Sequence, residues 1–384
     1  LARLRKVSLR DQYNASNLAY DWLTIKHVDR SLTNYKRRMV MFDFTDMLEK
    51  FVHEGHNWCP HFDLCFIDEA QDLSPLQWDM AHFLDEKSER MYVAGDDDQA
   101  IYRWAGADVD AFINLDGPSE TLTNSYRIPF KVHHVAESIV KRIDRRFPKQ
   151  YDPKQEEGNV EYRHMVEDID MSKGTWLILA QAGYQLHPVA TTLRSFGHLF
   201  KYNGARSISI KLSDAVNGWE QLRKGEKITG KTARNMYSYM STKDTIKTTR
   251  HVAKGFKTLS GLEDTDMVNM QDLSVNFGLL AGIELKWHEA MDRIPERDRA
   301  YIIALLRRGE KFNGEPRITV STIHGAKGGE ADNVAVFTDL SPAAEQHMRH
   351  APDDMHRVFY VAVTRAKKNL FIIESQDATR SYDL

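Results

Sequence analysis

The chain has 384 residues, of which 42% are hydrophobic and 28% are charged, and its formal net charge is −3. These proportions are typical of a soluble globular protein, and the length suits two or three domains. The sequence has no apolar run as long as a membrane span, so we expect no membrane partner. The small net charge excludes a positive field over the whole molecule, so a nucleic-acid surface has to be local.

Two features of the composition indicate where the protein works and where it could bind polyanions. Cys59 and Cys65 are the only cysteines and form no metal or disulfide pattern, which favours a reducing cytoplasm. The basic runs at residues 36–38 and 141–149 are the local candidates for a nucleic-acid surface. Runs of this kind are more often solvated faces than binding sites.

The first hundred residues predict a strand–helix–strand unit after a polar, helical start. Apolar runs within residues 64–72 and 91–99 predict two strands. Ser74 and Pro75 predict the start of a helix that continues to about residue 85. This spacing is typical of a right-handed parallel unit, in which ligands bind at the carboxyl ends of the strands.

Acidic and aromatic residues follow both predicted strands. The first strand ends in "FIDEAQD", where Asp68 could bind Mg²⁺ and Glu69 could deprotonate an attacking water. The second is followed by "GDDDQAIYRWAGA", in which Gln99 could contact a γ-phosphate and Tyr102 and Trp104 could stack on bases. Taken singly, such acids often only solvate a loop, and such aromatics often pack in a core.

The α/β pattern returns in the second half of the chain. Residues 175–181 predict a buried strand, and a helix follows from about residue 185 to 196. Residues 317–339 predict a strand, a glycine-rich loop and a strand, and residues 356–375 predict a helix and a last strand. The region between, about 206–312, is more polar and predicts helices. The expected fold class is therefore α/β, with two parallel-sheet lobes and a mainly helical insertion in the second.

Five segments of the chain resemble one family. They are, in order, "DEAQD", "GDDDQAIYRWAGA", "LTNSYRIP", "STIHGAKGGEADNVAVF" and "VFYVAVTRAKKNL", and "FDFTDML" precedes them. Together they resemble the later motifs of superfamily 1A DNA helicases, the UvrD/Rep/PcrA family. Five motifs in this order, spanning residues 42–374, are far more specific than any one of them.

The resemblance implies two RecA-like lobes of the P-loop NTPase type. Residues 1–118 would be the remainder of the first lobe, with part of the 1B insertion near 1–40. The second lobe would comprise residues 119–205 and 313–384, interrupted by an accessory, 2B-like insertion at 206–312. This insertion is shorter than in the large bacterial enzymes, which implies a compact, bacterial or phage-encoded relative.

The resemblance also implies roles for the candidate site residues. Asp68 would bind Mg²⁺ and the nucleotide, and Glu69 would be the catalytic base. The residues that act on the phosphates would be Gln99, Arg127 and Arg365, the last as the arginine finger. The residues on the adenine and the ribose would be Tyr126 and Glu330. The residues along the DNA path would be Tyr102, Trp104, Thr322 and His324.

These roles describe an ATP-driven motor. The resemblance implies ATP and Mg²⁺ as cofactors, single-stranded DNA and single-strand/double-strand junctions as partners, and 3′→5′ movement coupled to duplex separation. It implies a monomer and identifies no accessory protein. In such a motor the cleft closes when arginines of one lobe reach phosphates held by the other, and hydrolysis releases it.

One stretch satisfies the phosphate-loop pattern, and we interpret it as a coincidence. Gly225-x-x-x-x-Gly230-Lys231-Thr232 fits G-x-x-x-x-G-K-[ST]. No strand is predicted before it, it follows Asp68 instead of preceding it, and it lies in the polar insertion. Since Gly55 is the only glycine before Asp68, we expect that the chain, which begins at Leu1, lacks the segment carrying the functional loop and the first DNA-binding motif.

Two alternatives stay open beside the helicase. One is a DNA-binding or partner-binding module that has this fold and does not hydrolyse ATP. Such a binder has no need of Glu69, Gln99, Arg127 and Arg365 together, which favours the motor. The other is a phosphotransferase using Gly225–Thr232, which would need a strand before the loop and an acid near Lys231.

Overall fold

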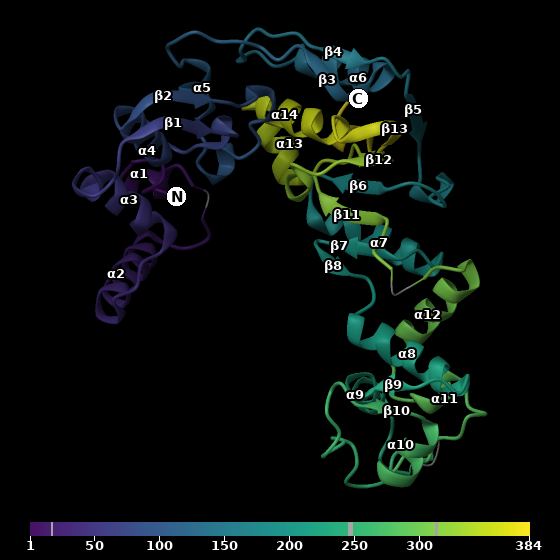
Figure 1. The fold of residues 1–384 in the computed structure, drawn as a ribbon. Coiled ribbons are helices and arrows are strands. Elements are labelled where there is room, and N and C mark those ends of the chain that lie inside the picture. Colours follow the sequence, from purple (N-terminus) through teal and green to yellow (C-terminus); the bar gives the residue numbers. More distant parts are fainter. Residues whose placement is uncertain (17, 245–248, 312–313) are drawn as a thin grey trace. The chain divides into compact units, whose positions relative to one another are not determined.

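The computed structural model describes residues 1–16, 18–244, 249–311 and 314–384. The chain forms two compact units (Figure 1). Unit 1 consists of residues 1–160, 340–370 and 382–384, and unit 2 of residues 161–339 and 371–381. Each unit is a set of residues that contact one another more than they contact the rest of the chain. The predicted division into two lobes and an insertion has other boundaries and stays a prediction.

Unit 1 contains the predicted strand–helix–strand element. Its helices and strands are α1 (Leu9–Asn14), α2 (Trp22–Met39), α3 (Phe44–Glu54), β1 (Phe62–Ile67), α4 (Pro75–Glu86), β2 (Ser88–Val93), α5 (Val109–Ile113), β3 (Asn124–Pro129), α6 (Phe130–Val140), β4 (Asp152–Lys154), α13 (Pro342–Met348) and α14 (Pro352–Val363). Strands β1 and β2 pair in parallel, as the sequence predicts, and so do β3 and β4. Helix α4 starts where expected, with the N–H and the hydroxyl of Ser74 both bonded to Gln77 Oε1.

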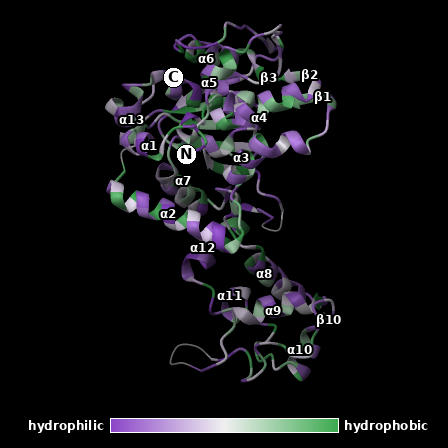
Figure 2. Ribbon diagram, turned by 90° about the vertical axis from the view of Figure 1, so that its left-hand side faces the viewer, coloured by the Kyte–Doolittle hydropathy of each residue, from purple (hydrophilic) through white to green (hydrophobic). Residues whose placement is uncertain are grey.

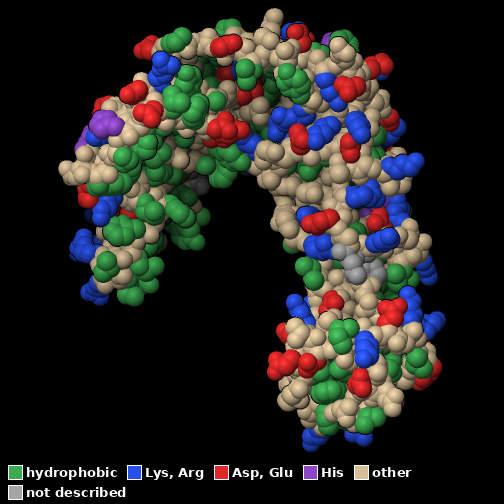
Figure 3. All heavy atoms as spheres, viewed as in Figure 1, with side chains coloured by type: hydrophobic (Ala, Val, Ile, Leu, Met, Phe, Trp, Pro, Cys, Tyr) green, Lys and Arg blue, Asp and Glu red, His purple; other side chains and the backbone are tan. Residues whose placement is uncertain are grey.

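The two faces of the β1–β2 sheet differ in their burial. On one face Ile67 and Val93 pack against Trp78 of α4 and its neighbours. On the other face the side chains of Phe62, Leu64, Phe66 and Tyr92 are between 37% and 70% exposed. Parallel sheets usually have both faces covered, and Figure 3 shows hydrophobic side chains gathered on the surface around these elements.

Helix α2 is largely exposed. Asp21 caps it by accepting a hydrogen bond from the N–H of Thr24, and none of its residues is buried. Figure 2 shows hydrophilic and hydrophobic residues mixed along it. Its basic end is partly neutralised, because Lys36 forms ion pairs with Asp43 and Asp46.

Unit 2 is built on one sheet. Its helices and strands are β6 (Trp176–Ala180), α7 (Leu186–Ser195), β7 (Phe200–Tyr202), β8 (Ala205–Arg206), α8 (Ile210–Arg223), β9 (Ile228–Thr229), α9 (Gly230–Ser238), β10 (Met267–Val268), α10 (Met270–Asn276), α11 (Trp287–Ala290), α12 (Glu296–Arg308), β11 (Ile318–Thr322) and β12 (Ala331–Phe337). The sheet also takes in β5 (Asn159–Arg163) and β13 (Ala366–Ile373), whose ends Glu161–Arg163 and Phe371–Ile373 belong to this unit.

The strand order in this sheet is β5-β13-β12-β6-β11-β7-β8. Strand β6 lies in parallel between β11 and β12, and all five of its residues are buried, as expected of a central strand. Between β8 and β11 the chain forms helices and the antiparallel pair β9–β10. The α/β fold class with a mostly parallel sheet is thus confirmed. No helix in the described part of the chain is both long enough and apolar enough to cross a bilayer.

Candidate nucleotide and DNA site

The two acidic strand ends of unit 1 lie side by side. The backbone pairing of β1 and β2 continues past the strands, since Ala94 N–H bonds to Ile67 O and Ala70 N–H bonds to Ala94 O, each within 3.0 Å. Asp68 and Glu69 follow β1 directly and are exposed. Glu69 has a left-handed backbone (φ 54°), which is uncommon for a residue with a side chain. The two carboxylates are therefore presented to solvent at the carboxyl edge of the sheet.

Gln99, which follows β2, contacts Arg365, which follows α14. Arg365 Nη2 donates to Gln99 Oε1 over 2.9 Å, and Gln99 Nε2 donates to Asp96 Oδ2 over 2.7 Å. Gln99 and Arg365 are 266 positions apart in the sequence, and the fold brings them into contact. The resemblance assigns both residues to the nucleotide phosphates.

The environment of Arg365 is unusual for a guanidinium. The residue is 3% exposed, and its other hydrogen bonds go to neutral oxygens of Val361 and Thr364. Burial and the nearby charge of Arg127 lower the pKa of Arg365 to about 10, against the opposing influence of Glu69 and Asp96. A buried guanidinium next to a second one gains most from a dianionic or trianionic ligand such as a nucleotide phosphate.

Three aspartates of the loop after β2 bind the ammonium group of Lys149. Oxygens of Asp96, Asp97 and Asp98 lie within 4.8 Å of one another, a grouping that could hold a metal ion. Lys149 Nζ lies there instead, 3.0 Å from Asp96 Oδ1 and from Asp98 Oδ2 and in contact with Asp97. Arg146 adds two bonds to Asp98, of 2.9 and 2.7 Å. These two basic residues are therefore structural and are not available to the candidate nucleic-acid surface at 141–149.

The remaining candidates in unit 1 lie on exposed segments. Tyr126 and Arg127 are neighbours on β3, and Tyr126 is 91% exposed. Tyr102 and Trp104 flank Arg103 in a short turn, with ring centroids 6.4 Å apart, and Trp104 is 65% exposed. Trp104, exposed beside the half-buried Tyr102, is a suitable stacking surface for bases.

Three candidates belong to unit 2. Thr322 ends β11, and its hydroxyl accepts a bond of 3.1 Å from the N–H of Gly325. His324 lies in the following turn and is half-buried, and Glu330 is exposed just before β12. All three lie at or after the carboxyl end of β11, where parallel sheets bind ligands.

The stretch that matches the phosphate-loop pattern is occupied by the chain itself. It follows helix α8 instead of a strand and leads into α9. The N–H groups of Gly230 and Lys231, which would have to face phosphate, bond to the carbonyls of Asp266 and Asp264 over 2.8 and 3.1 Å. A Cβ on Gly230 would lie 2.0 Å from the carbonyl oxygen of Glu263. The interpretation of this match as a coincidence is confirmed, which also removes the basis for a phosphotransferase.

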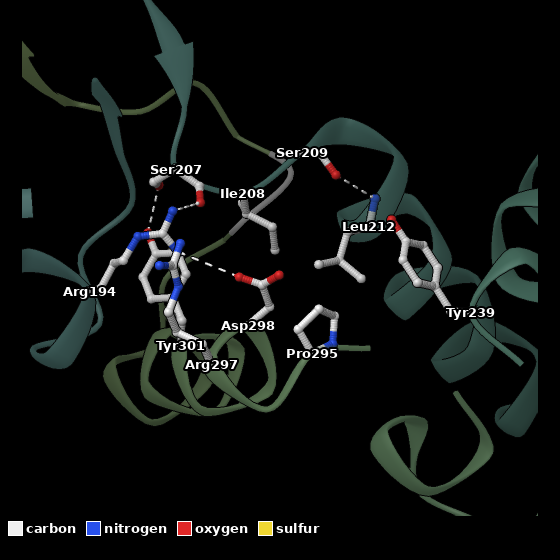
Figure 4. A pocket seen from close by; sticks show the side chains of 10 residues that line it. All are labelled: Arg194, Ser207, Ile208, Ser209, Leu212, Tyr239, Pro295, Arg297, Asp298 and Tyr301. Atoms are coloured by element: carbon white, nitrogen blue, oxygen red, sulfur yellow. Dashed lines mark hydrogen bonds and ion pairs between the residues drawn. The ribbon is translucent and has the colours of Figure 1, made fainter. Parts of the chain in front are cut away.

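A cavity of about 360 Å³ lies in unit 2 between α7, the start of α8 and α12 (Figure 4). Arg194 is held by other residues of the lining. Arg194 bonds to the carbonyl of Ser207, lies 3.7 Å from Asp298 and covers the ring of Tyr301. We assign it no ligand.

Comparison with known proteins decides the family. Residues 3–119 match the UvrD/REP helicase N-terminal domain, and residues 206–377 match the UvrD-like helicase C-terminal domain. The chain belongs to the UvrD/Rep family of superfamily 1A helicases. The resemblance inferred from the five motifs is therefore confirmed.

The similarity to individual relatives is partial. The chain is 29% identical over 131 residues to the ATP-dependent DNA helicase PcrA of Bacillus subtilis (strain 168), which covers 33% of this chain and 17% of that protein. It is 31% identical over 161 residues to PcrA of Staphylococcus aureus (strain Mu50), or 35% and 22% of the two chains. A probable DNA helicase II homolog of Mycoplasma capricolum is 31% identical over 91 residues, or 22% and 13%. The matched part is thus less than a quarter of each relative.

Several residues of this UvrD-family site were not identified from the sequence. Gln71 is completely buried between the two strand ends, and Arg357 is equally buried and donates to Asp97 O over 2.8 Å. The sequence offered one indication for Gln71, its position among the acids of "DEAQD". An amide next to carboxylates has a hydrogen-bond partner at hand. No local signal distinguishes Arg357, Arg146 or Lys149 from surface residues.

Proposed function

We propose that the chain is part of an ATP-dependent DNA helicase that moves 3′→5′ along single-stranded DNA. The observation that carries the proposal is the grouping of Glu69, Gln99, Arg127 and Arg365 in unit 1, with Arg365 bonded to Gln99. This grouping contains a carboxylate, an amide and two guanidinium groups. In phosphoryl transfer, a carboxylate can act as the base, an amide can position the phosphate, and guanidinium groups can stabilise the negative charge.

The residues at the strand ends fit the proposed cofactors. Oxygen ligands suit Mg²⁺, and Asp68 would supply one. Glu69 would accept the proton of the attacking water. Gln99 would hold the terminal phosphate in place, and Arg127 and Arg365 would stabilise the negative charge that develops on it. Hydrolysis of the nucleotide supplies the free energy for movement.

The outer parts of the site would position the nucleotide and the DNA. Tyr126 would lie on the adenine and Glu330 would bind the ribose. The DNA path would be formed by Tyr102, Trp104, Thr322 and His324. These assignments rest on the family motifs and on the exposure of Tyr126 and Trp104.

DNA-stimulated ATP hydrolysis by the full-length protein is the test. The chain and its Lys231→Ala variant should bind Mg-ATP equally, because the Lys231 amide is already bonded within the chain. Glu69→Gln should retain nucleotide binding and lose turnover. Binding that disappears in Lys231→Ala would contradict our placement of the nucleotide.

A second experiment separates the motor from a binding module. Strand separation is measured on duplexes with a 3′ or a 5′ single-stranded overhang, and the proposal predicts activity with the 3′ overhang. DNA binding without DNA-stimulated hydrolysis would support the binding module, and unwinding from the 5′ overhang would contradict the polarity.

A further inference from the structure

Gln71 connects the two acidic strand ends of unit 1. Its Nε2 donates to Glu69 Oε2 over 2.6 Å, and its Oε1 accepts from the backbone N–H of Asp96 over 2.9 Å. The side chain is 0% exposed although Glu69, which it holds, is an exposed residue. A buried amide therefore joins the residue after β1 to the loop after β2.

The orientation of this amide is determined by its two partners. A carboxylate can only accept a hydrogen bond and a backbone N–H can only donate one. The reversed amide would face oxygen to oxygen at Glu69 and hydrogen to hydrogen at Asp96, so a single arrangement satisfies both. A carboxyl, a hydrocarbon or a shorter amide at this position would lose at least one of the two bonds.

Gly95 leaves the space that the amide needs. A Cβ on Gly95 would lie 2.5 Å from Gln71 Oε1 and 2.8 Å from the ring of Phe112. Such a separation is below any normal contact, and the surrounding core leaves no room for displacement. The glycine before the aspartates is thus explained by the close approach of Gln71.

We infer that Gln71 is a positioning residue that holds the Glu69 carboxylate in register with the Asp96–Gln99 loop, so that base and phosphate sensor are placed together. Glu69 needs such a restraint because its carboxylate is exposed and its backbone lies in the left-handed region. Asp96 in turn accepts the bond from Gln99. The path from Glu69 through Gln71 and Asp96 to Gln99 consists of three hydrogen bonds.

This inference rests on the proposed hydrolysis of ATP, and its test measures two quantities. The variants are Gln71→Leu, which loses both bonds, and Gln71→Glu, which can keep an acceptor for Asp96 but presents a second carboxyl to Glu69. Gln77→Glu is the matched control, because it is nearby and half-buried and keeps the acceptor for Ser74. The readouts, in the full-length protein, are kcat and KM for ATP with DNA, and hydrogen exchange of the Asp96 amide.

We expect Gln71→Leu to lower kcat roughly 10- to 100-fold with KM for ATP unchanged, since misplacement of a catalytic group acts on the chemical step. Its Asp96 amide should exchange faster than in the wild type. Gln71→Glu should also lower kcat with KM for ATP unchanged, because it places a second carboxylate beside that of Glu69 where the amide donates a hydrogen bond. A purely structural role would not lower kcat alone while leaving KM unchanged.

The outcomes separate the two hypotheses. If Gln71→Leu has a kcat within about twofold of the Gln77→Glu control, the positioning role is wrong although the ATPase stands. If the full-length wild-type protein hydrolyses no ATP with DNA, the proposed function fails and the catalytic role of Gln71 fails with it. An Asp96 amide that exchanges equally in wild type and Gln71→Leu would show that the bridge itself is absent.

Discussion

Replacing Lys149 by Met should destabilise unit 1 strongly. The ammonium is the cation shared by Asp96, Asp97 and Asp98, and the side chains of Asp97 and Asp98 are 2% and 0% exposed. Removing one partner of a buried ionic group leaves the other charges uncompensated, which costs about 3–5 kcal/mol. Arg146 remains bonded to Asp98, so we expect the lower end of this range.

The loss of unfolding free energy in Lys149→Met should be smaller at acidic pH than at neutral pH. Burial raises the pKa of Asp98, but the bonds from Arg146 and the charge of Lys149 lower it more, so it lies below its usual value. Burial likewise opposes the charge on Lys149, and the aspartates outweigh it and raise its pKa. An Asp whose pKa is lowered by folding stabilises the protein above its unfolded pKa of about 3.9, and a Lys whose pKa is raised does so below about 10.4. The full difference in unfolding free energy between wild type and variant should therefore appear between these pH values and shrink in acid.

The assay is urea unfolding of wild type and variant at several pH values, with hydrogen exchange of residues 92–100 to localise the effect. Lys141→Met is the matched control, because the Lys141 side chain is 69% exposed and its change should cost less than about 0.5 kcal/mol. Two results would refute the ionic role of Lys149. One is an unfolding free energy of Lys149→Met within about 0.5 kcal/mol of that of Lys141→Met at pH 7, and the other is a difference between wild type and Lys149→Met that grows in acid.

Three further predictions concern other parts of the chain. Gly230→Ala should destabilise unit 2 by about 1–3 kcal/mol in urea unfolding because its Cβ would meet the carbonyl of Glu263, whereas the exposed Lys231→Ala should be neutral; equal effects would contradict the packing of this turn. Burial and neighbouring arginines lower the pKa of His198 to about 4, so the unfolding free energy of unit 2 should fall as the pH drops from about 6.5 towards that value, and a His198→Gln variant should lack this dependence. Phe66→Thr should reduce the binding of a hydrophobic dye with less than about 0.5 kcal/mol change in stability, since Phe66 is 70% exposed, and undiminished dye binding would show that this face is not the exposed apolar surface.

Local patterns predicted the elements of this fold well. The apolar runs that end in acids became β1 and β2 in parallel, and the Ser-Pro signal became the start of α4. The strand–loop–strand pattern at residues 317–339 became β11 and β12. These predictions succeed because strand burial, caps and turns are set by residues close together in the sequence.

The phosphate-loop match shows where a local pattern misleads. The letters fit, but the amides of Gly230 and Lys231 are bonded to carbonyls more than thirty residues away in the sequence. A motif reports residue types, whereas binding requires donors that the fold leaves available. The basic run at 141–149 gives a second example, because Lys149 pairs with the aspartates that follow β2 and is not available to a polyanion.

The sequence by itself determined the family, the α/β class and the candidate residues, because ordered motifs and strand-end acids are properties of the linear chain. Only the tertiary structure determined that Gln71 joins Glu69 to Asp96, that Arg365 meets Gln99, and that Lys149 takes the place a metal could occupy. These contacts link residues from separate elements. Their partners are chosen by which strand ends and helix ends the fold brings together, and by the cost of burying a polar or charged group without a partner.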